Sequence, residues 1–192
     1  MAKVTGPLFS LSASGKIGDA MVHFGWKGIN VVRQWLKPAN PKAAIQGNIR
    51  TILGNLGRSV GKVVVDSAYH EQLKTLDVIP AAQTKQSYLV QYIKDNYLAG
   101  GGASLTGNYV GILAEFTGHG AYSAFEDSAD TLTLVAFNSA YDNITSWDKG
   151  LGLYLLAKAA IALGFTGSPY TTSLASWTTT QVGLFVADLT GA

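Results

Sequence analysis

The sequence predicts an α+β fold in which an N-terminal arm and a β-hairpin are followed by a mainly helical body. Residues 20–36 alternate apolar and polar side chains and are rich in β-branched and aromatic residues, which is typical of strands. After Pro41 the apolar side chains instead recur at steps of three or four, the period of an amphipathic helix. Residues 1–15 follow neither period, and this indicates an extended arm.

The hairpin is predicted from the residues on either side of Lys27-Gly28. A two-residue loop there would place Trp26 opposite Ile29 and Phe24 opposite Val31. Lysine is a weaker choice than Asn or Asp at the first position of such a loop. A longer loop that starts two residues earlier therefore remains the alternative.

A long helix is expected next, because Asn40 is a good N-cap and Pro41 suits the first helical position. Glycine recurs every seven residues along it, at Gly47, Gly54 and Gly61. Each glycine costs ~1 kcal/mol relative to alanine. Either another backbone approaches this face closely, or the glycines break the helix into shorter pieces. The expected apolar stripe consists of Ile45, Ile49, Ile52, Leu53, Leu56, Val60 and Val63.

The remaining elements follow from shorter patterns. The segments with helical spacing are 66–75, 81–99 and 147–165, of which the last is the clearest, and Gly100-Gly101-Gly102 ends the second. The segments that fit either short helices or strands are 109–116, 131–140 and 177–189.

Charge divides the chain into two predicted parts. Residues 1–62 carry nine Lys and Arg against one acid, Asp19, whereas residues 63–192 carry five bases against eleven acids. Charged residues make up only 14% of the chain, below the ~25% of an ordinary soluble domain. We therefore predict a basic assembly module at 1–62, an acidic body at 63–192, and a homo-oligomer. The alternative is a compact monomer covered by uncharged polar side chains.

No set of residues in the sequence forms a recognisable catalytic motif. The chain has no cysteine, and its histidines, His23, His70 and His119, are far apart, so we predict neither a metal site nor a cofactor. The glycine-rich residues 100–107 lack the Lys-Ser/Thr of a phosphate-binding loop.

Acidic residues give weaker signals. The cluster of Glu126, Asp127 and Asp130 lacks calcium-loop spacing, so it is expected to be a solvated turn or a docking surface for the basic segment. Glu71, Glu115 and Glu126 could in principle meet as a hydrolase pair, although nothing local favours this. We predict no catalytic residues.

A membrane span is not expected. The most apolar stretch, residues 151–165, is fifteen residues long with Lys158 at its middle, and a spanning helix needs about 20 apolar residues. The first residues lack the apolar core of a secretion signal, because Gly6 and Pro7 interrupt it. The chain is therefore expected to be made in the cytoplasm.

The first quarter of the chain resembles a known class of protein. The runs Gly15-Lys16-Ile17-Gly18-Asp19, Lys27-Gly28-Ile29-Asn30-Val31-Val32-Arg33 and Pro38-Ala39-Asn40-Pro41-Lys42, followed by Gln46 and Arg50, are similar to a segment of virion structural proteins of tailed bacteriophages and prophages. Ala43 stands where that pattern often has threonine. The resemblance covers about residues 15–50. It implies a protein repeated in the particle, at the capsid surface, the neck or the tail, and it supplies no catalytic residues.

These observations together predict a structural component of a phage particle, made in the host cytoplasm and located in the virion. Its partners would be copies of itself and other virion proteins. The alternatives are a DNA-binding protein that uses the basic segment, and a particle-borne hydrolase of cell wall or polysaccharide. The residues expected to make subunit contacts are Trp26, Arg33, Trp35, Lys42 and Arg50.

Overall fold

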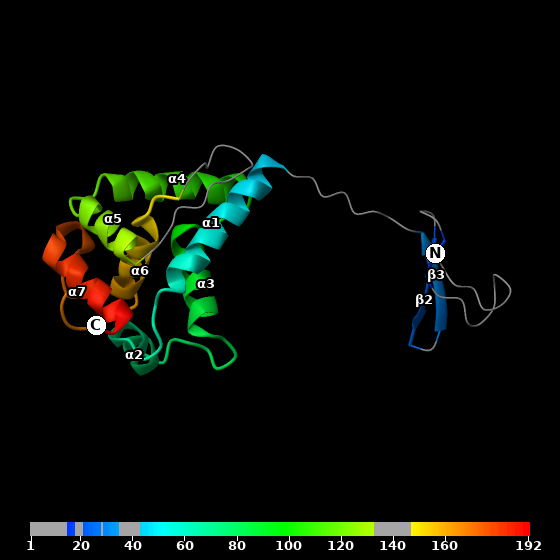
Figure 1. Cartoon of the computed structure of the whole chain (residues 1–192), viewed down its shortest axis with the longest axis horizontal. Helices are drawn as coiled ribbons and strands as arrows, with labels where there is room; N and C mark the ends of the chain where they lie inside the picture. The colour runs from blue at the N-terminus through cyan, green and yellow to red at the C-terminus, as the bar shows by residue number, and fades with distance from the viewer. Residues whose placement is uncertain (1–14, 18–20, 28, 35–42, 133–146) are drawn as a thin grey trace. The chain divides into compact units, whose positions relative to one another are not determined.

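A computed structural model describes residues 15–17, 21–27, 29–34, 43–132 and 147–192 of the chain (Figure 1). The chain divides into two compact units, Met1–Pro41 and Lys42–Ala192. This division groups the first long helix with the helices after it, whereas the sequence analysis grouped it with the arm. The assembly role of residues 1–62 stays a prediction.

The first unit contains three short antiparallel strands in the order β1, β2, β3. They are β1 (Gly15–Ile17), β2 (Met21–Trp26) and β3 (Ile29–Gln34). Trp26 pairs with Ile29 and Phe24 with Val31, which is the register predicted for a two-residue loop. Lys27 in the loop has a φ of 50°, as the tight turns between paired strands require.

The second unit contains only helices in its described residues. They are α1 (Ala44–Val60), α2 (Ala68–Thr75), α3 (Lys85–Tyr97), α4 (Ala103–Thr117), α5 (Tyr122–Thr131), α6 (Leu151–Ala162), the short 3-10 helix η1 (Leu174–Ser176) and α7 (Thr179–Thr190). The predicted α+β class is therefore wrong, and the chain is mainly helical. An α+β fold needs a sheet as one layer of its core. Here the helices of the unit bury their apolar side chains against one another, so the core is complete without a sheet.

Helix α6 is the central helix of this unit. It contacts α1, α3, α4, α5 and η1, and it is buried along nearly its whole length. An all-round apolar sequence suits such a position, because every face meets another helix. The prediction of a helix within residues 147–165 is confirmed. Gly152 allows the closest approach, since a Cβ built there would lie 1.8 Å from Ser59 Oγ of α1.

Helix α1 is continuous through Gly47 and Gly54, so these two do not break it, whereas it ends at Val60 with Gly61 as its C-cap. Nor does a described backbone approach Gly54, where no described atom lies within 4 Å of an added Cβ. Within the described residues of one chain, neither interpretation explains Gly54.

The apolar stripe predicted for α1 is only partly buried. Ile45 is 44% exposed, while the polar residues Asn48, Thr51, Asn55 and Ser59 are 2–3% exposed. The Thr51 and Ser59 hydroxyls donate to the carbonyl oxygens of Gly47 and Asn55 one turn earlier, which makes their burial tolerable. The buried face of α1 therefore includes these polar residues together with Ile52, Leu56 and Val60 of the predicted stripe.

The other predicted elements agree with the structure to different extents. Segments 66–75 and 81–99 contain α2 and α3, and segment 177–189 covers α7 except its last residue. The starts of these three helices are capped by the side chains of Ser67, Thr84 and Thr178. Helix α4 begins six residues before the predicted segment 109–116, and α5 was not predicted as a helix. Asn40 and most of segment 131–140 lie outside the described residues.

Candidate functional site

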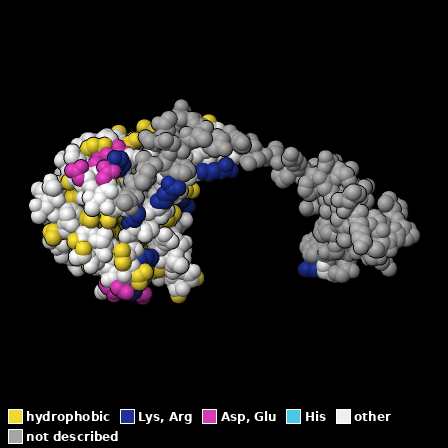
Figure 2. Space-filling model, viewed as in Figure 1, with side chains coloured by type: hydrophobic (Ala, Val, Ile, Leu, Met, Phe, Trp, Pro, Cys, Tyr) yellow, Lys and Arg dark blue, Asp and Glu magenta, His cyan; other side chains and the backbone are white. Residues whose placement is uncertain are grey.

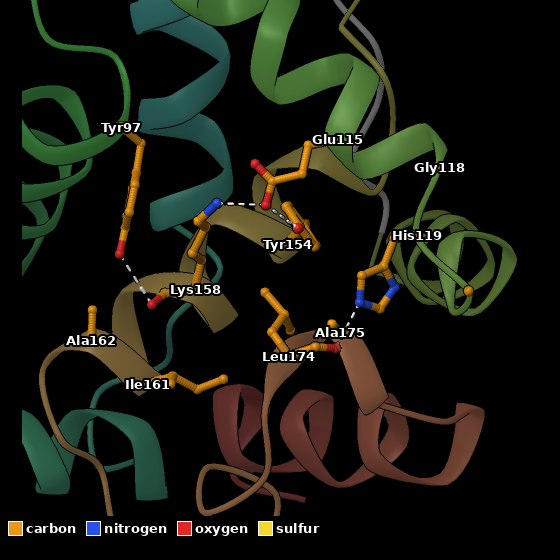
Figure 3. Close-up of a pocket in the computed structure, with 11 residues that line it drawn as sticks. Tyr97, Glu115, Gly118, His119, Tyr154, Lys158, Ile161, Ala162, Leu174 and Ala175 are labelled. Atoms are coloured by element: carbon orange, nitrogen blue, oxygen red, sulfur yellow. Dashed lines mark hydrogen bonds and ion pairs between the residues drawn. The ribbon is translucent and has the colours of Figure 1, made fainter.

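A cavity of about 580 Å³ opens in the helical unit where the end of α3, the α4–α5 turn, α6 and η1 meet (Figure 3). Ligand-binding cavities range from about 300 to 1,000 Å³. The side chains and backbone that line it come from Tyr97, Glu115, Gly118, His119, Gly120, Tyr154, Lys158, Ile161, Ala162, Leu174 and Ala175. This cavity is the strongest candidate site among the described residues.

An ion pair forms the polar side of the cavity. Glu115 Oε1 accepts a hydrogen bond of 2.6 Å from Lys158 Nζ and one of 2.7 Å from the Tyr154 hydroxyl. Tyr154 and Lys158 stand one turn apart on α6, so both side chains reach the same carboxylate of α4. The pair links α4 to the central helix.

The Lys158 ammonium also lies beside two aromatic rings. Its Nζ is 5.4 Å from the centroid of Tyr97 and 5.9 Å from that of Tyr154, within the range of cation–π attraction. The Tyr97 hydroxyl donates to the Lys158 carbonyl oxygen at 3.1 Å. The end of α3 is thereby attached to α6 at the cavity.

His119 is fixed at both ring nitrogens. The backbone N–H of Ala121 donates to Nδ1 at 3.0 Å, so Nε2 is the nitrogen that donates to the Leu174 carbonyl oxygen, at 2.6 Å. Figure 3 shows the ring turned toward η1. Neither nitrogen is left to bind a metal or to accept a proton from a substrate.

The titration behaviour of the cavity does not favour proton transfer. Burial works to raise the pKa of Glu115, but the hydrogen bonds from Lys158 and Tyr154 outweigh it and leave that pKa below its usual value. Burial raises the pKa of Tyr97 to about 12, and burial together with the bond to Glu115 raises the pKa of Tyr154. At neutral pH Glu115 is ionised and both phenols are protonated, so none of the three is a general base poised near neutrality. The arrangement suits binding better than catalysis.

A second acidic site joins α5 to the start of α6. Glu126 Oε1 accepts from the Gly150 backbone N–H at 2.6 Å, and the Tyr122 hydroxyl donates to Asp148 Oδ2 at 3.0 Å. Burial and the neighbouring Asp148 carboxylate raise the pKa of Glu126 to about 7. The predicted solvated turn is thus a helix, and Glu126 caps the next one.

Asp66, His70 and Glu71 are the one group within the described ranges whose ligand atoms could surround a metal ion. Lys74 Nζ already lies 2.6 Å from Glu71 and 3.7 Å from Asp66. Its ammonium supplies the positive charge that a cation would bring. This cluster is an exposed ion-pair network.

The three candidate hydrolase carboxylates have separate sets of partners. Glu71 pairs with Lys74, Glu115 with Tyr154 and Lys158, and Glu126 with the backbone of Gly150. Their hydrogen bonds and ion pairs do not bring two of them together as a pair.

The predicted contact residues are only partly described. Arg50 is exposed on α1, and Figure 2 shows Lys and Arg side chains gathered over that helix. Trp26 and Arg33 are in β2 and β3, whose side chains are not described, and Trp35 and Lys42 lie outside the described residues. The structure therefore does not test whether these five act together.

The cavity was not predicted from the sequence. Its signal was the spacing of Tyr154 and Lys158, four residues apart on an otherwise apolar helix. Their partner Glu115, on another helix, could not be found from spacing alone.

Comparison with known proteins gives no family, because no family model, no curated protein and no solved structure matches the chain. Within the part of the chain that the structure describes, none of the helices has the length and apolar character needed to span a bilayer.

Proposed function

We propose that this protein is a structural subunit of a tailed-bacteriophage particle, and that it assembles with copies of itself and with other virion proteins through residues 1–62. The proposal rests on the opposed charge of the two parts of the chain, together with the resemblance of residues 15–50 to phage virion proteins. Its location would be the capsid surface, the neck or the tail.

The acidic part of the chain has more carboxylates than its own bases can neutralise. Residues 63–192 hold eleven acids against five bases. Lys74, Lys94, Lys149 and Lys158 each pair with an acid of the same unit. Within residues 63–192 an excess of six acids remains even if every base of that segment is paired. Four bases of residues 42–62 belong to the same unit, so the unit Lys42–Ala192 as a whole keeps an excess of two acids. The basic residues 1–62 of an adjacent subunit are cations of the right sign, and opposite charges on two copies favour association.

The mass of the native full-length protein tests this proposal. We expect a large, discrete oligomer at low salt and a smaller species as ionic strength rises, because exposed charge pairs are screened. The measurement is native mass spectrometry with light scattering across a salt series. A monomer at every salt and protein concentration would overturn self-assembly.

Charge reversal identifies the contact residues. Arg33→Glu combined with Arg50→Glu should weaken the oligomer by about tenfold or more while the helical unit keeps its circular dichroism and melting temperature. The control is Lys94→Glu with Lys149→Glu, which changes net charge equally on the body at two half-buried lysines paired with Asp95 and Asp130. Equal effects of the two double variants would mean that only net charge matters.

The DNA-binding alternative makes a different prediction. Residues 1–62 would then bind duplex DNA with an affinity that falls steeply with salt, and the Arg33/Arg50 variant would lose that binding. A fluorescence-anisotropy titration of the full chain measures it. Strong DNA binding by a protein that stays monomeric would replace the assembly proposal.

A further inference from the structure

We propose that the cavity between α4, α6 and η1 binds a neutral sugar ring through the Glu115–Lys158 pair. The inference is independent of the assembly proposal, because the cavity lies wholly within the helical unit. It assigns a ligand class to this mostly apolar cavity of about 580 Å³.

The charges of the cavity select against an ionic ligand. Lys158 and Glu115 neutralise each other at 2.6 Å. An anion bound to the remaining donors of Lys158 would be repelled by the Glu115 carboxylate, and a cation bound to Glu115 would be repelled by the Lys158 ammonium. A neutral ligand meets neither cost, because the ion pair stays intact.

The unused hydrogen-bonding capacity is a donor beside an acceptor. Glu115 Oε1 takes both bonds, from Lys158 and from Tyr154, so Oε2 has no partner among the described residues. Lys158 has three N–H donors and uses one on Glu115. A hydroxyl group both donates and accepts. Two adjacent hydroxyls on one ring can therefore bond to Oε2 and to Nζ together.

The opposite side of the cavity is apolar. Figure 3 shows Ile161 and Leu174 across the open space from Glu115 and Lys158, with Ala162 and Ala175 at its edge. A pyranose has C–H groups on its faces and hydroxyls around its rim, so one ligand offers both kinds of surface. Fatty acids match the apolar side alone, and their carboxylate opposes Glu115.

Titration with matched rings of different charge tests the proposal. The full-length protein is titrated with methyl glucopyranoside and methyl galactopyranoside, which are neutral, and with glucuronic acid and glucosamine, which are charged. Binding is followed by saturation-transfer NMR and amide chemical shifts. We expect at least one neutral ring to bind with a dissociation constant on the order of 1 mM, the scale for so small a ligand, and the charged rings to bind several-fold more weakly. If neither neutral ring binds, or if the charged rings bind as well, the proposal is wrong.

Blocking the cavity locates the binding. Ala162 is exposed and lines the cavity, so Ala162→Trp fills it without entering the core, and we expect a loss of affinity of about tenfold or more. Ala103→Trp, at an exposed position of α4 outside the lining, is the control. Equal affinity of the two variants would show that the sugar binds elsewhere.

Unbalancing the pair separates recognition from a purely structural role. Lys158→Met leaves Glu115 unopposed and should shift the preference toward glucosamine, whereas Glu115→Gln should shift it toward glucuronic acid. A structural role of the pair would lower the melting temperature of both variants and leave their order of preference unchanged. That unchanged order would overturn the assignment of the pair to the ligand.

Discussion

Helices α1 and α6 pack against each other but follow opposite rules. Helix α6 is apolar along most of its surface and is buried by its neighbours, whereas α1 buries polar side chains beside its apolar ones and leaves Gly54 exposed. Hydrophobic pattern alone therefore locates α6, and on α1 it finds the buried Ile52, Leu56 and Val60 but not the buried polar residues beside them. The comparison teaches that a close helix contact can be set by a glycine of one partner, Gly152, against a small polar residue of the other, Ser59.

The largest effect is expected where the two helices touch. Gly152→Ala should lower the free energy of unfolding by about 3 kcal/mol, because its Cβ would lie 1.8 Å from Ser59 Oγ and 2.4 Å from Ser59 Cβ, so the helices must separate. Urea denaturation followed by circular dichroism measures the change. Adding Ser59→Gly should recover part of the loss. A variant as stable as the parent would mean that this contact does not set the helix spacing.

The polar face of α1 offers a second test. Asn55 is 2% exposed and its Nδ2 has no hydrogen-bond partner among the described residues. A buried donor without a partner costs free energy, so Asn55→Leu should raise the free energy of unfolding by about 1–2 kcal/mol. Asn96→Leu on the exposed surface of α3 is the control, with little change expected. Destabilisation by Asn55→Leu would show that the amide is needed where it is.

Much of the helical unit could be predicted from sequence, for identifiable reasons. The residues of α6, Leu151–Ala162, are almost all apolar, so the sequence predicts a buried helix there. Helix α3 is marked by the capping Thr84 before it and by three glycines after it. Helix α5 was missed because its acidic stretch resembles a turn. Its burial depends on Phe125, whose contacts with Phe116, Tyr154 and Trp177 come from distant parts of the chain.

The fold class could not be predicted because the hairpin and the helices belong to different units. Alternation predicts strands, but it does not tell whether those strands form a layer of the main core. The candidate cavity was missed for a related reason. Glu115 and Lys158 are 43 residues apart, and only the packing of α4 on α6 brings them together.

The start of α6 is stabilised from outside the helix, and this gives a pH-dependent prediction. Gly150 supplies no side-chain cap, and Glu126 of α5 accepts its N–H instead. The pKa of Glu126 is about 7 in the folded protein against an ordinary 4.5. The stability that its protonated form contributes is therefore fully present below pH 4.5 and is lost as pH rises through 7.

Glutamine keeps that contribution at every pH, since it cannot ionise. Glu126→Gln should equal the parent at pH 4.5 and exceed its free energy of unfolding by about 1 kcal/mol at pH 8, a value reduced by the partial exposure of the side chain. Thermal melts at the two pH values measure the difference. Asp127→Asn, one residue along and exposed, is the control for removing a carboxylate from α5. A constant offset for Glu126→Gln would mean that its titration is not linked to folding.

The smallest expected effect concerns the exposed face of α1. No packing contact within the described unit requires a glycine there. Gly54 lies in mid-helix with no described atom within 4 Å of an added Cβ. Gly54→Ala should therefore raise the free energy of unfolding by about 0.5–1 kcal/mol, because alanine loses less backbone entropy on forming a helix. The same substitution is thus expected to have opposite signs at Gly54 and Gly152. If Gly54→Ala stabilises the monomer but weakens the oligomer, then a neighbouring subunit approaches α1 at this glycine. The backbone contact that the glycine permits would then lie between two chains rather than within one.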